Sequence, residues 1–125
     1  MPDNKVVMII DDDKLNLSML KDVFEKNGYS TITAEDGNEA LEKINSNKVD
    51  FVLLDLILPG LDGLSFLAVV KDSAATKDIP VLVLTSRDSE ETREEVVKLG
   101  AVDCLIKQKT SPAEVYNMVT ELMAG

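Results

Sequence analysis

Residues 6–13 read VVMIIDDD, an apolar run that passes without a break into three aspartates. A continuous apolar run rich in branched residues is typical of a strand that is buried on both faces, as in a parallel sheet. Similar runs lie at residues 51–54, 81–84 and 102–106. The run at residues 30–34, STITA, is more polar, which favours an edge strand with one face near water. These runs predict five short strands in all.

Stretches with the apolar spacing of helices separate these strands. The final stretch opens with Ser111-Pro112-Ala113-Glu114, a capping box with proline at the first helical position. The first helix ends at Asn27-Gly28, a typical left-handed terminator, the second begins at Asp36 and the third begins near Leu61. The residues expected to face the core are Leu17, Leu20, Val23, Phe24, Ala40, Leu41, Ile44, Phe66, Leu67, Val70, Val115, Met118, Val119 and Leu122.

The fourth helical stretch differs from the others because it is so polar. Residues 88–95 contain no strongly apolar side chain, so the expected anchors are Val96, Val97 and Leu99, just before Gly100. The glutamates of this stretch are interpreted as a solvated helix face whose charges also suit the helix dipole. We therefore expect the fourth helix to be weakly anchored.

The strict alternation of strands and helices defines the fold class. Right-handed crossovers between successive strands produce an open, five-stranded parallel sheet with five helices distributed over both faces, an α/β architecture. A chain of 125 residues is long enough for one domain, so residues 1–125 are predicted to form a single domain. Ligands in such sheets bind beyond the carboxyl ends of the strands, which directs attention to the residues found there.

Composition excludes several classes of function. The chain carries 13 Lys and Arg against 23 Asp and Glu, a net charge of −10, which disfavours direct binding to nucleic acid or anionic lipid. It contains no histidine, so catalysis and metal ligation by histidine are excluded. Cys104 has no cysteine partner and is expected to be a small buried hydrophobe. No apolar run approaches the length of a bilayer span, and we expect a soluble, cytoplasmic protein.

Charged and hydroxyl side chains follow four of the predicted strands. Asp11 and Asp12 follow the first strand, Asp55 the third, Thr85 the fourth and Lys107 the fifth. All of them would converge on one edge of the sheet. Two carboxylates ~4 Å apart repel by about 4 kcal/mol at an effective dielectric constant of ~20, so such a cluster needs a cation. An all-oxygen ligand set suits Mg²⁺.

An acidic metal site that faces a hydroxyl and a lysine is suited to a phosphoryl group. Mg²⁺ and Lys107 can neutralise the phosphoryl oxygens, Thr85 can donate a hydrogen bond to one of them, and a carboxylate can be the nucleophile. Asp55 is the best candidate acceptor because it ends the most continuous apolar strand. The turn at residues 56–60 would fix its direction and could offer a backbone carbonyl to the metal.

Four motifs in this order resemble the receiver domain of bacterial two-component response regulators. They are VMIIDDD at residues 7–13, LDLILPGLDG at 54–63, LTS at 84–86 and GAVDCLIK at 100–107. The resemblance covers essentially the whole chain. It implies a flavodoxin-like fold with the strand order 2-1-3-4-5.

The resemblance also implies a phosphotransfer role. Asp55 would accept a phosphoryl group from the phosphohistidine of a histidine kinase or a histidine phosphotransfer protein. Thr85 and Lys107 would bind the phosphoryl oxygens. The chain would then be no enzyme in the ordinary sense, because it performs only self-phosphotransfer and slow self-dephosphorylation.

The metal ligands implied by the resemblance come from two strand ends. Asp12 would bind Mg²⁺ directly and Asp11 mainly through water, while Asp55 and the backbone carbonyl of Ile57 would complete the protein ligands. Asp13 occupies a position that is often polar in the family, and we assign it a helix-capping role.

Two departures from the family concern signalling. The family usually has Lys-Pro after the fifth strand, often with a cis bond, whereas here Lys107 precedes Gln108, so this bond is either a costly non-proline cis peptide or an ordinary trans one. Cys104 replaces the aromatic residue that commonly swings inward on activation. Signalling would then use the Thr85-Ser86 loop and the weakly anchored fourth helix.

A third departure concerns the lifetime of the phosphorylated state. Ile57 and Arg87 occupy places that tune hydrolysis of the phosphoaspartate in the family. The apolar side chain of Ile57 cannot position a water molecule, so we predict slow self-dephosphorylation.

Other functions remain as alternatives. A degenerate receiver could act as a phosphorylation-independent protein-binding module, which the missing proline and aromatic residue favour. A flavin-binding protein is disfavoured because three aspartates would repel the flavin phosphate. A metal-dependent phosphatase would need an acid where Ile57 stands. The output is expected to pass through a downstream protein partner or a missing output domain, at the face formed by the fourth helix, fifth strand and fifth helix.

Overall fold

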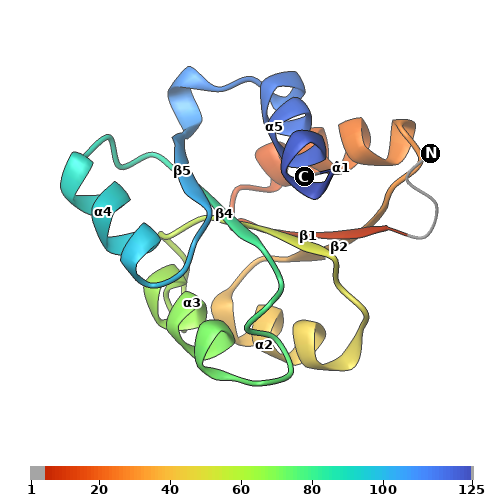
Figure 1. Ribbon diagram of the computed structural model, residues 1–125. Helices are drawn as coiled ribbons and strands as arrows, with labels where there is room; N and C mark the ends of the chain where they lie inside the picture. Colours follow the sequence, from red (N-terminus) through yellow and green to blue (C-terminus); the bar gives the residue numbers. More distant parts are fainter. Residues whose placement is uncertain (1–4, 125) are drawn as a thin grey trace.

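The computed structural model describes residues 5–124 and shows strands alternating with helices along the chain (Figure 1). The strands are β1 (Val6–Ile10), β2 (Ser30–Ala34), β3 (Phe51–Leu54), β4 (Val81–Thr85) and β5 (Asp103–Ile106). The helices are α1 (Lys14–Lys26), α2 (Gly37–Ser46), α3 (Gly63–Asp72), α4 (Glu90–Lys98) and α5 (Pro112–Ala124), and a short 3₁₀ turn, η1 (Lys107–Lys109), follows β5.

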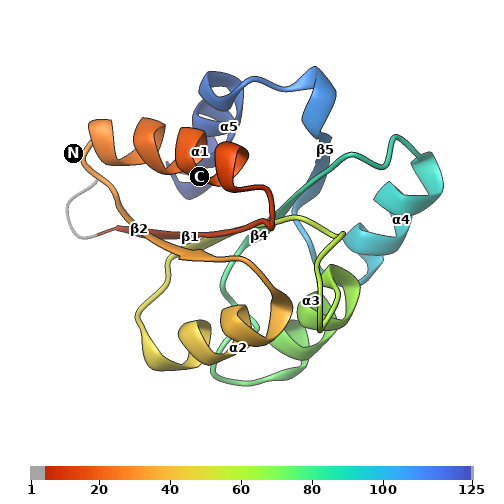
Figure 2. The same ribbon diagram turned by 180° about the vertical axis from the view of Figure 1, so that it is seen from behind.

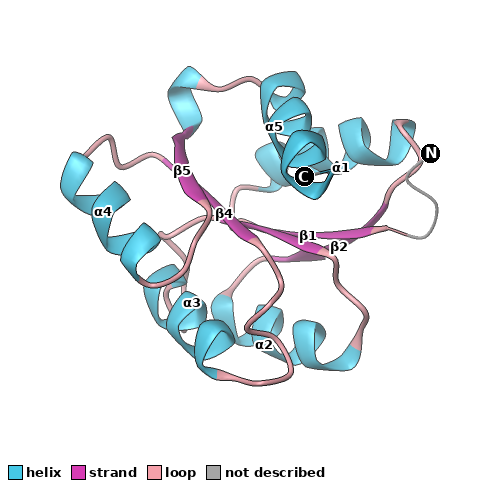
Figure 3. Ribbon diagram, viewed as in Figure 1, coloured by secondary structure: helices cyan, strands magenta, loops and turns pink. Residues whose placement is uncertain are grey.

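All five strands pair in parallel in the order β2-β1-β3-β4-β5, which confirms the predicted topology. Helices α1 and α5 cover one face of the sheet, and α2, α3 and α4 cover the other (Figures 1 and 2). Figure 3 shows how the loops that enter and leave the helices lie at the two ends of the strands. The α/β fold class inferred from the alternating apolar patterns is therefore confirmed.

The core consists of two apolar layers, one on each face of the sheet. Side chains of β1, β3 and β4 are buried throughout, except for the half-buried first residue of β1, as the continuous apolar runs predict. Strand β2 is buried only at its last residue, which confirms its prediction as an edge strand. The buried phenylalanines Phe24, Phe51 and Phe66 fill the largest volumes, with Phe24 and Phe51 in one layer and Phe66 in the other.

The starts of α1 and α5 agree with the capping residues read from the sequence. Asp13 caps α1 by accepting hydrogen bonds from the backbone N–H groups of Leu15 and Asn16, which confirms its predicted role. Ser111 and Glu114 form the predicted reciprocal capping box of α5. Helix α3 begins at Gly63, slightly later than predicted, because the Asp62 side chain caps it.

The packing of α4 and α5 corrects two predictions. Val97, expected to anchor α4, is 47% exposed, whereas Thr92 and Val96 are buried. Thr92 and Val96 lie four residues apart and therefore share one helix face. The next residue, Val97, is turned by about 100° around the helix axis, so its side chain points away from that face. Leu122 of α5 was also predicted to face the core but is 37% exposed. Helix α4 is thus held by even fewer apolar side chains than expected.

Candidate acidic site

Strand register brings two of the predicted aspartates side by side. Ile10 of β1 lies opposite Leu54 of β3, so Asp11 and Asp55 are the first residues beyond two neighbouring strands. The backbone N–H of Asp55 donates to the Ile10 carbonyl at 3.0 Å, which extends the sheet to the edge of the site. Carboxylate oxygens of Asp11, Asp12 and Asp55 lie within 4.8 Å of one another. The predicted acidic cluster is therefore present.

The three carboxylates of this cluster differ in their exposure to solvent. Asp11 is 2% exposed and Asp55 is 5% exposed, whereas Asp12 is exposed. Burial of neighbouring carboxylates is unfavourable unless positive charge compensates them. The exposed Asp12 leaves the cluster open toward solvent on one side, where a hydrated cation can approach.

Lys107 supplies a compensating charge from the far end of the chain. Its Nζ lies 2.8 Å from Asp11 Oδ2 and 3.0 Å from Asp55 Oδ2, although β5 is not a neighbour of β1 or β3. Burial lowers the pKa of the Lys107 ammonium, but its contacts with Asp11 and Asp55 outweigh burial and raise that pKa above its ordinary value. Lys107 is therefore held in its charged form between the two carboxylates.

The pKa of Asp55 is shifted in the same direction for a different reason. Burial raises the pKa of this carboxyl, and the hydrogen bonds from Lys107 and from the backbone N–H of Ile57 only partly offset that effect. The Ile57 N–H lies 3.2 Å from Asp55 Oδ1. Additional positive charge near Asp55 would favour its ionised, nucleophilic form.

Asp11 is more fully hydrogen-bonded than Asp55. Its Oδ1 accepts from the backbone N–H of Asp13 at 2.9 Å, and its Oδ2 accepts from Asn16 Nδ2 at 2.6 Å in addition to Lys107 Nζ. Asn16 is a site residue that the sequence analysis did not identify. The only available signal was its place in the first turn of a helix that starts directly after the aspartates.

Glycines allow the loop after β3 to fold closely on itself and against the start of α2. A Cβ at Gly63 would lie 2.5 Å from Leu56 Cα and 2.6 Å from the Asp55 carbonyl oxygen. Real Cβ atoms essentially never come this close to another heavy atom. The Gly63 N–H donates to the Leu56 carbonyl at 3.0 Å. A Cβ at Gly37 would overlap the Leu61 carbonyl. The backbone that carries Asp55 and Ile57 is thus fixed by two close approaches.

Thr85 and Ile57 lie at the same edge of the sheet but outside the salt-bridged group. Thr85 ends β4, its side chain is completely buried, and its Oγ1 accepts from the Arg87 N–H at 3.3 Å. Ile57 is 47% exposed, two residues beyond Asp55. The structure therefore brings together Asp11, Asp12, Asp55 and Lys107. The roles predicted for these residues, for Thr85 and for the Ile57 carbonyl stay predictions.

The residues that depart from the family pattern also have definite places. Every peptide bond within residues 5–124 is trans, so the bond between Lys107 and Gln108 is the ordinary trans form. Cys104 is buried on β5, as predicted, and burial raises the pKa of its thiol, which disfavours a reactive thiolate.

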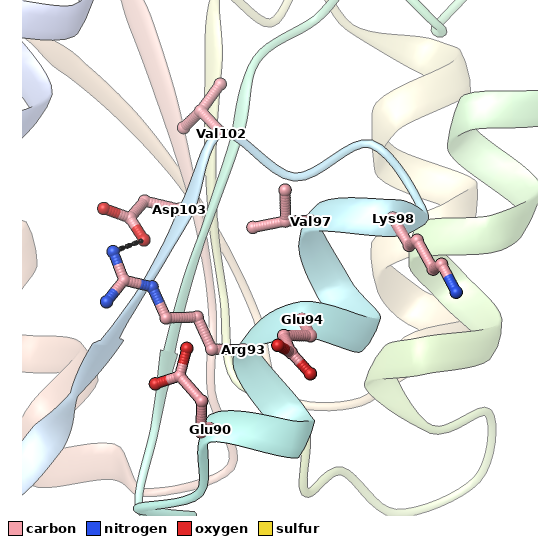
Figure 4. A pocket seen from close by; sticks show the side chains of 7 residues that line it. All are labelled: Glu90, Arg93, Glu94, Val97, Lys98, Val102 and Asp103. Atoms are coloured by element: carbon pink, nitrogen blue, oxygen red, sulfur yellow. Dashed lines mark ion pairs between the residues drawn. The ribbon is translucent and has the colours of Figure 1, made fainter.

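An open groove of about 710 Å³ lies away from the acidic cluster, between α4 and β5 (Figure 4). Arg93 of α4 spans it, with Nη2 3.0 Å from Asp103 Oδ1 of β5. The exposed side chains of Val97 and Val102 add apolar surface to its lining. This groove belongs to the face that was predicted to contact partners. Separately, none of the helices within residues 5–124 has both the length and the apolar character needed to span a bilayer.

Comparisons with known proteins assign a class to this fold, which has an acidic cluster and a lysine at the carboxyl edge of its sheet. The family model of the response regulator receiver domain matches residues 7–120, and the chain belongs to this family. The resemblance read from the four motifs is thereby confirmed.

Individual relatives support the same assignment. The chain is 36% identical over 117 residues to the phosphate regulon transcriptional regulatory protein PhoB of Klebsiella pneumoniae, covering 94% of this chain and 51% of the relative. It spans about half the length of the curated relatives it matches.

Solved structures of response regulators are similar to this one. The receiver domain of Francisella response regulator 1452 has a TM-score of 0.89 and 37% identity, covering 97% of this chain and 98% of that one. A Burkholderia pseudomallei response regulator, whose structure contains a phosphorylated aspartic acid, a calcium ion and citrate, has a TM-score of 0.77 and 34% identity, covering 83% and 60%.

Proposed function

We propose that this receiver domain is switched by Mg²⁺-dependent phosphorylation of Asp55. The observation that carries the proposal is the position of Lys107 Nζ, within hydrogen-bonding distance of both Asp11 and Asp55. A cation held between two buried carboxylates marks the place where a phosphoryl group and a metal would be stabilised. A similar response regulator from Burkholderia pseudomallei contains a phosphorylated aspartic acid.

Asp55 is a better acceptor than Asp11 because fewer donors engage it. Asp11 accepts hydrogen bonds from three groups, one of them the Asn16 side chain, and both of its oxygens are engaged by the chain around it. Asp55 accepts from the Ile57 N–H and from Lys107 Nζ. When Lys107 moves to a phosphoryl oxygen, Asp55 Oδ2 becomes free to attack. It forms a bond to phosphorus as the bond between phosphorus and the donor's leaving group breaks.

The donor atoms of the acidic cluster fit a hard divalent cation. Carboxylates of Asp11, Asp12 and Asp55 offer oxygen ligands within 4.8 Å of one another, with no nitrogen or sulfur among them. These residues, with the Ile57 carbonyl, would hold Mg²⁺. When bound, Mg²⁺ would neutralise charge on the acceptor and on the phosphoryl oxygens.

The phosphodonor is a separate protein or module, because this chain contains no histidine. We assign a histidine kinase or a histidine phosphotransfer protein as the donor. Phosphorylation then changes binding of a downstream partner or output domain at the face formed by α4, β5 and α5, which contains the groove of Figure 4. Slow loss of the phosphoryl group follows from the apolar Ile57 side chain, which offers water no hydrogen bond.

The alternative, a phosphorylation-independent binding module, is not favoured. In a binding module that is never phosphorylated, the acidic site would have no function. Burying Asp11, Asp55 and Lys107 in contact with one another costs free energy of desolvation, which such a module could avoid with apolar residues.

Intact-mass spectrometry after incubation with acetyl phosphate and Mg²⁺ tests the proposal. The native chain should gain the mass of one phosphoryl group, and Asp55→Asn should gain none. Asp22→Asn, which alters an exposed ion pair with Lys26 on α1, is the matched control and should gain the same mass as the native chain. A gain that persists in Asp55→Asn would reassign the acceptor. No gain in the native chain, together with no response to beryllofluoride, would overturn the proposed function.

A further inference from the structure

Two side chains of the turn after β5 contact the loop that leads from β4 to α4. Gln108 Nε2 donates a hydrogen bond to the Ser86 carbonyl at 3.3 Å, and Lys109 Nζ lies 2.7 Å from Asp88 Oδ2. We call this pair of contacts the cross-loop clamp. Figure 1 shows that the two loops leave the sheet at the same end of neighbouring strands β4 and β5.

The clamp connects the acidic site to the start of a helix. On one side, Gln108 directly follows Lys107, whose ammonium lies on Asp11 and Asp55. On the other side, Asp88 directly precedes Ser89, the N-cap of α4, whose side chain accepts from the Thr92 N–H. Gln108 of the clamp is therefore next to a residue of the acidic site, and Asp88 of the clamp is next to the N-cap of α4.

Helix α4 is able to respond to a small displacement of its first turn. Only Thr92 and Val96 of this helix are buried. An element with so few buried side chains can shift or fray at low cost in free energy. The trans peptide between Lys107 and Gln108 leaves the Gln108 side chain, where the family usually has proline, free to make the contact with Ser86.

We propose that Gln108 and Lys109 are positioning residues that make the two loops move as one unit, so that the place of Lys107 on the acidic site sets the first turn of α4. Lys107 Nζ lies 3.0 Å from Asp55 Oδ2, so a group added to that oxygen forces the ammonium to a new place. The backbone of η1 follows Lys107, and the clamp transmits the shift to Ser86 and Asp88. The signalling meaning of this link rests on the proposed function, whereas the link itself does not.

Amide hydrogen exchange of the full chain, resolved by NMR, tests the link without any phosphorylation. The double variant Gln108→Leu, Lys109→Met removes the clamp by changing exposed side chains only, so the fold should be retained. Because contacts at exposed positions are weak, exchange at the hydrogen-bonded amides of the two loops should rise by about two- to fivefold. These amides are those of Arg87, Thr92, Arg93 and Thr110. Lys21→Met, which removes an exposed ion pair on α1, is the matched control and should leave both segments unchanged.

Lys107→Met then tests whether the acidic site acts through the clamp. In the native background it should speed exchange in the first turn of α4, and in the clamp-less background it should add nothing there. An equal effect of Lys107→Met on the first turn of α4 in both backgrounds would overturn the inference. Unchanged exchange at the amides of Arg87, Thr92 and Arg93 in the double variant would overturn it as well.

Beryllofluoride with Mg²⁺ separates this inference from the proposed function. Fluorine NMR reports whether the probe binds at Asp55, and the amide shifts of residues 90–93 report whether α4 responds. Binding without an α4 response in the double variant supports the clamp, and an undiminished α4 response refutes it. If the native chain neither binds the probe nor gains a phosphoryl group from acetyl phosphate, the proposed phosphorylation fails, and the Lys107→Met comparison alone decides the inference.

Discussion

Lys107→Met should destabilise the protein and make its stability depend more strongly on Mg²⁺. The substitution keeps much of the side-chain volume but removes the charge that lies 2.8 Å from Asp11 and 3.0 Å from Asp55. Two buried carboxylates then face each other without a counter-charge. The Mg²⁺ of the proposed function would then be the cation that compensates them.

The size of the effect follows from these distances. Each contact has a gross attraction of about 5 to 6 kcal/mol at an effective dielectric constant of ~20, and the desolvation of three ionic groups offsets most of it. Removal of one partner from a buried ionic group costs about 3–5 kcal/mol. The Lys107 side chain is 20% exposed, whereas those of Asp11 and Asp55 are 3% and 6% exposed. Partial exposure of the lysine places the expected loss near the lower bound, about 3 kcal/mol.

Urea denaturation with and without Mg²⁺ measures this loss. The midpoint should fall while the slope with denaturant stays unchanged. At a free concentration of about 100 times the dissociation constant, a bound ion contributes about 2.7 kcal/mol, and Mg²⁺ should bind the variant more tightly because a competing positive charge is gone. Lys26→Met, in an exposed ion pair with Asp22, is the control and should cost less than about 1 kcal/mol. If Mg²⁺ stabilises the native chain and Lys107→Met equally, Lys107 does not neutralise the acidic site.

Three further substitutions test local features of the fold. Gly63→Ala should cost about 1–3 kcal/mol and slow phosphorylation of Asp55, because the added methyl group forces the backbone after β3 to move; unchanged stability in urea would contradict the close approach. Asp13→Ala should cost about 1 kcal/mol and Asp13→Ser much less, since serine can still cap α1; equal melting temperatures for the two variants would argue against capping. Val96→Ala should destabilise by about 1–3 kcal/mol and Val97→Ala by less than about 0.5 kcal/mol; similar losses, measured by thermal denaturation, would refute the assigned orientation of α4.

Local features of the chain were predictable because they depend on residues close in sequence. The continuous apolar runs predicted the strands of the sheet, and the polar run at residues 30–34 predicted the edge position of β2. Asp13 and Ser111 predicted helix starts through their own side chains. Asp11 and Asp55 could be placed at one edge because parallel strands present their carboxyl ends together.

Other features depend on how distant segments pack. Val97 was expected in the core, yet its side chain is exposed to solvent. The buried face of α4 is selected by the direction in which the helix packs on the sheet, and not by the apolar character of one residue. Asn16 joined the site only once α1 was placed beside the end of β1. Gln108 was visible as a departure from the family, but its contact with Ser86 joins two separate loops.

The sequence by itself thus determined the elements, the capping residues of α1 and α5, the order of acidic and basic side chains along the chain and the family to which they belong. Lys107 and Asp55 were expected at one edge of the sheet, but only the tertiary structure decided that the lysine contacts both Asp55 and Asp11 directly. It also decided that the turn after β5 is joined to the loop before α4. The physical reason is that backbone periodicity and capping act over a few neighbouring residues. Distances between strand ends, in contrast, depend on the order of the strands and on the side chains that fill the space between sheet and helices.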